Sequence, residues 1–242
     1  MKNIIEKLKI YGPKTFFSFA IGELKNKLLM QLIKGSYSQK GEDLIIDKLL
    51  KNKKRGFYVD VGAYDPKRFS NTYRFYQKGW RGINIEPDTI NYKKFLDARK
   101  RDINLNIGVG NGKQSLVFYK FIPDTLSTFS KKEAEEYKKQ GYKLVDTIKV
   151  KIESLSSIFS KYCKNKKIDF ISVDTEGYDL EVLKSNDWDK FRPTLICVES
   201  FEHHKSGGEH TEYNYIEPFL SKVGYKKVFE NGLNCIYTLK SV

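Results

Sequence analysis

The sequence predicts an α/β fold around a mostly parallel β-sheet, and two patterns lead to this expectation. From Gly56 onward, short apolar runs alternate with segments of helical composition, which is typical of parallel strands joined by helices. Close to the C-terminus, two strand-like runs, 225–229 and 233–239, are joined through Asn231-Gly232, a pair that favours tight hairpins. We therefore expect a parallel sheet that ends in an antiparallel hairpin.

The elements between these ends follow from composition and periodicity. The apolar runs predict strands at residues 57–62, 82–85, 103–109, 168–173 and 194–198. Amphipathic or charged segments predict helices at residues 72–77, 92–99, 131–140 and 178–184. The pair Asn111-Gly112 is a further turn signal, and it predicts a hairpin from the strand at 103–109 into a strand at 115–121.

The length of 242 residues suits one sizeable α/β domain. We place this domain at residues 36–242 and treat residues 1–35 as an N-terminal helical extension, because apolar residues there recur at helical spacing among lysines. Such a helix packs on the domain, lies on a membrane surface or joins two copies into a homo-oligomer. The sequence contains no run of 18 apolar residues, so no transmembrane segment is expected.

Charge and cysteine content narrow the classes of function. The formal net charge is +14, which suits nucleic acid, an acidic membrane or an anionic substrate as a partner. Much of the excess is lysine in front of apolar runs, as at Lys51 and Lys164, where solvated loops explain it. The three cysteines lack metal-binding spacing and the first residues lack the pattern of a secretory signal, so we expect a cytoplasmic location.

Acidic residues at the ends of two expected strands indicate a cationic cofactor. Asp60 and Gly62 end the first strand, and Glu86 follows the second. Ligands of such sheets bind beyond the carboxyl ends of the strands, where Gly62 lets a ligand approach the backbone and Glu86 can accept hydrogen bonds from a ribose diol. The glycine-rich loop that dinucleotides require is absent. Asp60 would repel a phosphate but attract the ammonium and sulfonium groups of S-adenosylmethionine.

Four blocks of the sequence form recognisable motifs. They are Tyr-Ser-Gln-Lys-Gly-Glu-Asp at 37–43, the segment 56–63 followed by Pro66, Ser70, Asn71 and Thr72, the segment 79–87, and the segment 169–177 with Glu-Val-Leu at 181–183. Over residues 36–240 the chain resembles the FkbM-type methyltransferases. The resemblance implies a Rossmann-like class I methyltransferase fold with a seven-stranded sheet. It also implies O-methylation by S-adenosylmethionine, mostly of sugars and of other natural-product or surface-glycan hydroxyls. We therefore expect the acceptor to be a sugar or a nucleotide-linked sugar, in surface-polysaccharide synthesis.

The same resemblance implies which residues hold the cofactor. Those expected around it are Asp60, Gly62, Ala63 and Glu86, with Gln39, Ser70 and Asn71 at its amino-acid end. Asn106 and Ile107, at the end of the third strand, would flank the adenine. Many Rossmann-like methyltransferases have an acidic residue near this position, so Asp102 is the alternative to Asn106.

Three carboxylates at the ends of the fourth and fifth strands are candidates for catalysis: Asp174, Glu176 and Glu199. A sugar hydroxyl is a poor nucleophile without a general base or a metal ion. One mechanism has a divalent cation (Mg, Mn or Fe) held by Asp174 and Glu199; the other has His203 or Asp174 as a metal-free base. Repulsion among the carboxylates favours the metal. Alternatively, Asp174 and Glu176 only cap the following helix.

Other classes of function compete with this interpretation. A nucleic-acid methyltransferase would explain the charge, but the chain lacks an Asn/Asp-Pro-Pro-aromatic motif and a Pro-Cys nucleophile, so no nucleic-acid partner is expected. Another small metabolite as the acceptor stays open. A non-catalytic glycan-binding scaffold is hard to reconcile with acidic residues at four strand ends, namely Asp60, Glu86, Asp174 and Glu199.

Overall fold

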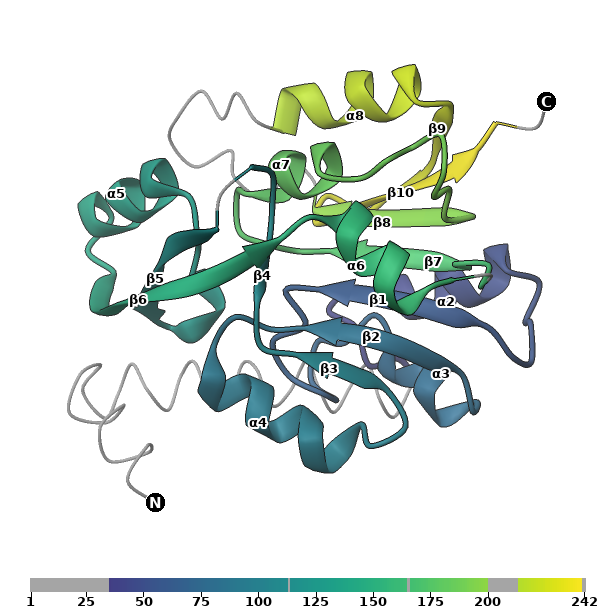
Figure 1. Ribbon diagram of the computed structural model, residues 1–242, viewed down its shortest axis with the longest axis horizontal. Helices are drawn as coiled ribbons and strands as arrows, with labels where there is room; N and C mark the ends of the chain where they lie inside the picture. The colour runs from purple at the N-terminus through teal and green to yellow at the C-terminus, as the bar shows by residue number, and fades with distance from the viewer. Residues whose placement is uncertain (1–34, 113, 165, 200–212, 241–242) are drawn as a thin grey trace.

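The computed structural model describes residues 35–112, 114–164, 166–199 and 213–240, and these build a seven-stranded sheet (Figure 1). In spatial order the strands are β3 (Ile103–Leu105), β2 (Arg81–Ile85), β1 (Phe57–Val61), β7 (Phe170–Val173), β8 (Leu195–Glu199), β10 (Asn234–Leu239) and β9 (Tyr225–Glu230). In this sheet, β10 runs antiparallel to both of its neighbours and the other pairs are parallel. The expected mostly parallel sheet with a C-terminal antiparallel hairpin is confirmed.

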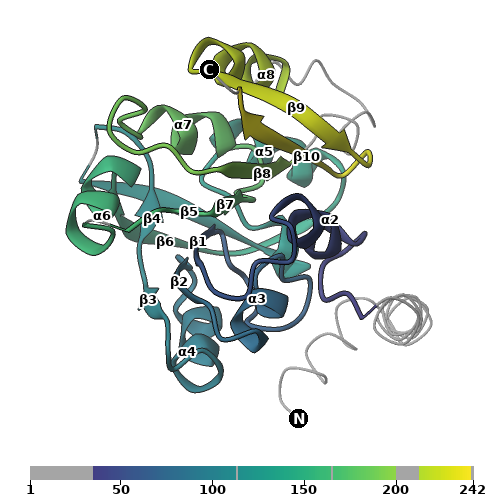
Figure 2. The ribbon, with the colours of Figure 1, turned by 90° about the vertical axis from the view of Figure 1, so that its right-hand side faces the viewer.

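Helices cover both faces of the sheet (Figure 2). One face carries α2 (Glu42–Leu49), α3 (Tyr73–Gln77) and α4 (Thr89–Ala98); the other carries α6 (Leu155–Tyr162), α7 (Asp179–Lys184) and α8 (Tyr213–Lys222). Side-chain caps fix some of the starts: Asp88 accepts backbone amides at the start of α4, and Ser154 does so for α6. In the described part of the chain, no helix has the length and apolar character needed to cross a membrane.

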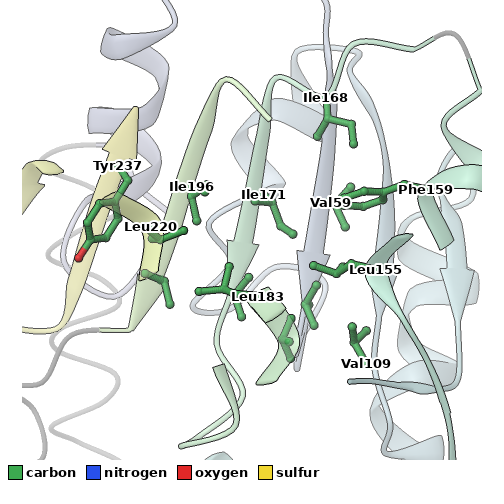
Figure 3. Packing of buried hydrophobic residues seen from close by; sticks show 14 of the residues in the cluster. Val59, Val109, Leu155, Phe159, Ile168, Ile171, Leu183, Ile196, Leu220 and Tyr237 are labelled. Atoms are coloured by element: carbon green, nitrogen blue, oxygen red, sulfur yellow. The ribbon is translucent and has the colours of Figure 1, made fainter. Parts of the chain in front are cut away.

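The larger hydrophobic core lies between the sheet and the helices α6, α7 and α8 (Figure 3). It contains, among others, Val59, Ile171, Leu183, Ile196 and Leu220. Because successive strand residues point to opposite faces, Tyr58 and Phe170 enter a second, aromatic cluster beside Trp80 and the helices α2 and α3. Burial on both faces explains why these strands are mainly apolar, with Asp60 and Ser172 as the polar residues of β1 and β7.

A small second sheet follows β3 and stands beside one end of the main sheet (Figure 1). Its segment, residues 108–153, is named the insertion here; it contains β4 (Gly108–Val109), β5 (Ser115–Ile122), the 3-10 helix η1 (Asp124–Leu126), α5 (Lys131–Lys139) and β6 (Lys143–Glu153). The prediction of a hairpin at Asn111-Gly112 is wrong, because β6 lies between β4 and β5 in the sheet. It is parallel to β4 and antiparallel to β5. β6 has 11 residues, so it can pair along all of β5, whereas β4 has only 2.

The N-terminal helical extension lies almost wholly outside the described residues. Its proposed packing, and its part in a homo-oligomer, therefore stay predictions. The bounds of the domain, residues 36–242, likewise stay a prediction. Between residues 57 and 198, the expected helices and strands form near their expected positions. The exceptions are the hairpin described above and the strand expected at 103–109.

Candidate active site

A pocket that is partly open to solvent lies at the carboxyl ends of β1, β2 and β7. The strand order changes direction between β1 and β7, and ligands of open α/β sheets bind at such a point. The predicted residues that line the pocket are Gln39, Asp60, Gly62, Ala63, Ser70, Asn71, Glu86, Ile107, Asp174 and Glu176. The insertion adds Phe118, Asp124, Thr125, Ser127 and Phe129 to the lining.

Gly62, just after β1, adopts a left-handed backbone conformation with φ +74°, which glycine accepts without strain. A Cβ built on it would lie 1.8 Å from the backbone carbonyl oxygen of Asp174. The amides of Gly62 and Ala63 donate to the carbonyl oxygen of Ile85, at 3.0 and 3.1 Å. The missing side chain makes room for the neighbouring strand end, and because Gly62 also lines the pocket, the approach of a ligand to its backbone stays a prediction.

Glu86 lies in the pocket directly after β2. Its two carboxylate oxygens accept hydrogen bonds from the backbone amides of Tyr64 and Asp88, both at 2.7 Å. Burial raises the pKa of Glu86 to about 8, against the opposing effect of these two donors. Each oxygen keeps a second lone pair, so the side chain is held in place and can still accept a hydrogen bond from a ligand hydroxyl.

Asp60 on β1 and the loop before α3 form one wall of the pocket. The Oδ2 atom of Asp60 accepts a hydrogen bond from the hydroxyl of Thr72 at 2.6 Å, and burial raises the pKa of Asp60 to about 6. Ser70 and Asn71 of the same loop line the pocket, and the Asn71 amide donates to the Ser172 hydroxyl on β7 at 3.0 Å. The residues assigned to the amino-acid end of the cofactor thus converge.

The Tyr-Ser-Gln-Lys-Gly-Glu-Asp motif forms the loop before α2. Asp43 accepts a hydrogen bond from the backbone amide of Tyr37 at 2.9 Å and from two serine hydroxyls. Glu42 accepts one from the side-chain amide of Asn231, 2.7 Å away in the turn between β9 and β10. The two acidic residues therefore shape and anchor this loop, and Gln39 lines the pocket.

The residues proposed for the adenine divide into two groups. Ile107 lines the pocket, whereas Asn106 does not belong to the lining. The side chain of Asn106 instead donates to two backbone carbonyl oxygens after β2, at 2.8 and 3.0 Å, and the strand expected at 103–109 is divided there into β3 and β4. The alternative, Asp102, also lies outside the lining and accepts a hydrogen bond from the Tyr58 hydroxyl at 2.6 Å.

Asp174, Glu176 and Glu199 converge as the sequence predicts. One carboxylate oxygen of each lies within 4.8 Å of the others. Asp174 and Glu176 line the pocket, and Glu199, the last residue of β8, is buried beside them. Burial raises the pKa of both Asp174 and Glu176 well above the usual range, and repulsion from Glu199 adds to the effect. Carboxylates this close favour either a shared proton or a bound cation.

Glu176 is fixed by two side chains of the insertion. Its backbone has φ +52°, which is uncommon for a residue other than glycine. The hydroxyl of Thr128 donates to its carbonyl oxygen at 2.7 Å, and the hydroxyl of Tyr137 on α5 donates to its carboxylate at 3.1 Å. The capping alternative is wrong for these carboxylates, because in the described residues neither accepts a backbone amide at the start of α7; Asp179, the first residue of that helix, instead accepts the amides of Thr175 and Gly177 in the loop before it.

Several residues around this site have no signal in the sequence that predicts them. Tyr137 and Asp124 lie on the insertion, far from any motif, and Arg99 lies at the end of an expected helix. No local pattern distinguishes such side chains from ordinary surface residues. His203, proposed as a base, lies in the segment 200–212, outside the described residues.

A family model for the methyltransferase FkbM domain matches residues 60–227 of the chain. The chain belongs to the FkbM methyltransferase family. It is therefore an S-adenosylmethionine-dependent methyltransferase with a Rossmann-like class I fold, and the family resemblance of the motifs is confirmed.

Solved structures similar to this FkbM methyltransferase have low sequence identity to it. An O-methyltransferase from Bacillus cereus in complex with SAH is 12% identical over 92% of this chain and 91% of that chain, with a TM-score of 0.43. A methyltransferase from Pyrococcus furiosus is 14% identical over 93% and 100%, with a TM-score of 0.43. A fibrillarin pre-rRNA processing protein from Methanococcus jannaschii is 13% identical over 77% and 67%, with a TM-score of 0.42. Among curated proteins, none matches the chain.

The pocket of this FkbM methyltransferase suits a cationic cofactor. Its lining contains the carboxylates of Asp60, Glu86, Asp88, Asp124, Asp174 and Glu176, and no described lining residue is lysine, arginine or histidine. The net charge of +14 therefore resides elsewhere on the chain. S-adenosylmethionine carries an ammonium and a sulfonium group, which an acidic pocket attracts.

Proposed function

We propose that this FkbM methyltransferase transfers a methyl group to a hydroxyl of a sugar or a nucleotide-linked sugar, in the synthesis of a surface polysaccharide. The observation that supports it best is the position of Asp174 and Glu176. Both carboxylates line the same pocket as the residues assigned to the cofactor. A hydroxyl that enters the pocket beside them meets groups able to take its proton or to hold a cation.

The residues assigned to the cofactor have distinct roles in this proposal. The amino-acid end is bound by Asp60, Ser70, Asn71 and Gln39, and the backbone beneath it is formed by Gly62 and Ala63. Glu86 accepts hydrogen bonds from the ribose hydroxyls. Ile107 contacts the adenine, and Asn106 supports this part of the pocket from behind the lining. S-adenosylmethionine, when bound, supplies an activated methyl group on its sulfonium. The protein contributes alignment of the acceptor oxygen with that group, and such alignment supplies much of the rate.

The acceptor oxygen is activated either by a divalent cation or by a general base. Asp174 and Glu199 would hold Mg, Mn or Fe, and Glu176 is close enough to join them, since the three donor oxygens lie within 4.8 Å of one another. Hard divalent cations favour such oxygen ligands. In the alternative, Asp174 or His203 takes the proton directly. The elevated pKa of Asp174, which burial causes, suits a group that binds a proton.

The lining suggests a neutral, polar acceptor. The insertion contributes the hydroxyls of Thr125 and Ser127 and the rings of Phe118 and Phe129, and sugars present both hydroxyl groups and apolar faces to proteins. A pyrophosphate would stay outside this acidic pocket, near surface lysines. We propose that the protein has no nucleic-acid partner and that it is cytoplasmic. We also propose that it forms a homo-oligomer through the N-terminal helix.

A screen of free and nucleotide-linked sugars tests this function. The protein is incubated with S-adenosylmethionine and each acceptor, and mass spectrometry detects the gain of one methyl group. Asp174→Asn serves as the inactive control. Methylation of RNA oligonucleotides, with every sugar left unmodified, would contradict the proposed acceptor and leave the methyltransferase assignment intact.

A further inference from the structure

Arg99, the residue that ends α4, is fully buried and uses its guanidinium group on several partners at once. Nε donates to the backbone carbonyl oxygen of Pro66 at 2.8 Å. Nη2 donates to the hydroxyls of Ser70 and Thr72, at 3.0 and 3.2 Å. Nη1 donates to the hydroxyl of Tyr58 at 2.8 Å. A single side chain thus joins the end of α4, strand β1 and two parts of the loop that precedes α3, its middle at Pro66 and its end at Ser70 and Thr72.

The surroundings of Arg99 compensate for the burial of its charge. The guanidinium carbon lies 4.9 Å from the ring centroid of Tyr73 and 4.9 Å from that of Tyr76, so cation–π attraction acts from two rings. Asp102, also buried, places a carboxylate oxygen 3.6 Å from Nη1. Burial of a charged group has a substantial desolvation cost even when the group has partners of this kind. The presence of the Arg99 guanidinium here therefore indicates that its position matters.

The contacts of Arg99 lead directly to the cofactor pocket, although Arg99 itself is not part of the lining. Thr72, which accepts from Arg99, donates to Asp60 at 2.6 Å. Ser70, which also accepts from Arg99, lines the pocket next to Asn71. The loop that carries Ser70 and Asn71 is therefore held from behind by the guanidinium. Asp60 is oriented by the hydroxyl of Thr72, which lies between Arg99 and Asp60.

We propose that Arg99 is a positioning residue that builds the wall of the pocket for the amino-acid end of the cofactor. This inference rests on the proposed function, in which Asp60, Ser70 and Asn71 bind that end. Arginine suits the task because its planar group presents five donors in fixed directions. Lysine has one ammonium on a flexible chain and cannot reach Pro66, Ser70 and Tyr58 together.

Two ligands that differ in the amino-acid end test the inference by calorimetry. S-adenosylhomocysteine carries this end, and 5′-methylthioadenosine lacks it. We expect Arg99→Lys and Thr72→Val each to weaken S-adenosylhomocysteine binding by about tenfold or more, and to change 5′-methylthioadenosine binding by less than about threefold. A general loss of structure would weaken both ligands alike. Thermal unfolding of each variant is recorded first, and if Arg99→Lys does not fold, Thr72→Val decides alone.

Arg101→Lys is the matched control. Arg101 is exposed, lies over the ring of Tyr76 at 4.1 Å and donates to the Tyr76 carbonyl oxygen. In the described residues, the side chain of Arg101 contacts Tyr76 on α3 and no residue of the loop before α3, so both affinities should stay unchanged. If the Arg99 and Thr72 variants bind both ligands more weakly to the same extent, or bind neither more weakly, the proposed role of Arg99 is overturned. That result would leave the proposed cofactor placement untouched. A wild-type protein that binds 5′-methylthioadenosine as tightly as S-adenosylhomocysteine would overturn the proposed cofactor placement as well.

Discussion

The backbone carbonyl oxygen of Asp174 lies where a side chain on Gly62 would have to be, 1.8 Å from the Cβ position. This close approach joins the ends of β1 and β7. The positions of the acidic residues in the pocket depend on these two strand ends. The substitution Gly62→Ala must therefore push the two strand ends apart. We expect a loss of about 3 kcal/mol or more in the free energy of unfolding, measured by urea denaturation, together with loss of S-adenosylmethionine binding.

Gly79→Ala is the matched control for that substitution. Gly79 also has a left-handed backbone, φ +86°, but a Cβ there meets nothing within 4 Å. Only the conformational cost remains, and we expect about 1 kcal/mol with cofactor binding unchanged. Equal effects at the two glycines would show that strain in the backbone, and not the contact with Asp174, is the important factor.

The affinity for S-adenosylmethionine should depend on pH through Asp60. Burial raises the pKa of Asp60 from 3.8 to about 6 in the ligand-free protein. The cofactor's ammonium favours the ionised carboxylate, so binding must release a proton below that pH, and affinity should fall by up to about tenfold per pH unit there. Calorimetry between about pH 5 and pH 7 measures this slope. In Asp60→Asn the affinity should be low and this part of the slope absent; an unchanged slope would contradict the assignment.

The stability of the ligand-free protein should fall as pH rises, in part through Glu86. Its pKa is 4.5 in the unfolded chain and about 8 in the folded protein, because of burial. Between these values the folded form keeps a proton that the unfolded form has lost, so raising the pH favours unfolding, by up to about 1.4 kcal/mol per pH unit. Glu86→Gln should reduce the slope of unfolding free energy against pH in this window. A steeper or unchanged slope in the variant would contradict the prediction.

Removal of divalent ions should abolish methylation if Asp174 and Glu199 hold a cation. We expect activity to disappear in chelator and to return with Mg or Mn. Asp174→Asn and Glu199→Gln should each weaken metal binding, followed by calorimetry, by about tenfold or more. Glu153→Gln, which removes an exposed pair with Lys151 on the insertion, is the control. Activity that persists in chelator would favour the general base instead.

The hydrogen bond from Tyr137 to Glu176 should matter for the chemical step and not for the cofactor. Tyr137→Phe removes the hydroxyl that lies 3.1 Å from the carboxylate. Without this hydrogen bond the Glu176 carboxyl group is free to turn away from Asp174 and Glu199, so we expect kcat to fall by about tenfold or more, with the KM for S-adenosylmethionine nearly constant. Tyr142→Phe is the control, since Tyr142 packs edge-on against the Tyr137 ring at 6.1 Å and is 40% exposed. A similar loss of kcat in both variants would argue against a specific role for the hydroxyl.

Short-range patterns in the sequence determined the sheet, its strand ends and part of the pocket. Asp60 and Glu86 were found because they lie at the carboxyl ends of apolar runs, and the ends of parallel strands meet at one edge of a sheet. The convergence of Asp174 with Glu199 follows from the same rule. The hairpin at Asn231-Gly232 was also readable, because a two-residue signal with strands on both sides is a local feature.

Only the tertiary structure decided which distant segments complete the site. Asn111-Gly112 has the same turn signal, yet β5 pairs with β6, because a longer partner elsewhere in the chain offered more pairing than β4 could. Tyr137 meets Glu176 across 39 positions and Arg99 meets Ser70 across 29. Such contacts depend on how elements pack in space and on the closure of long loops. A pattern of neighbouring residues does not contain this information.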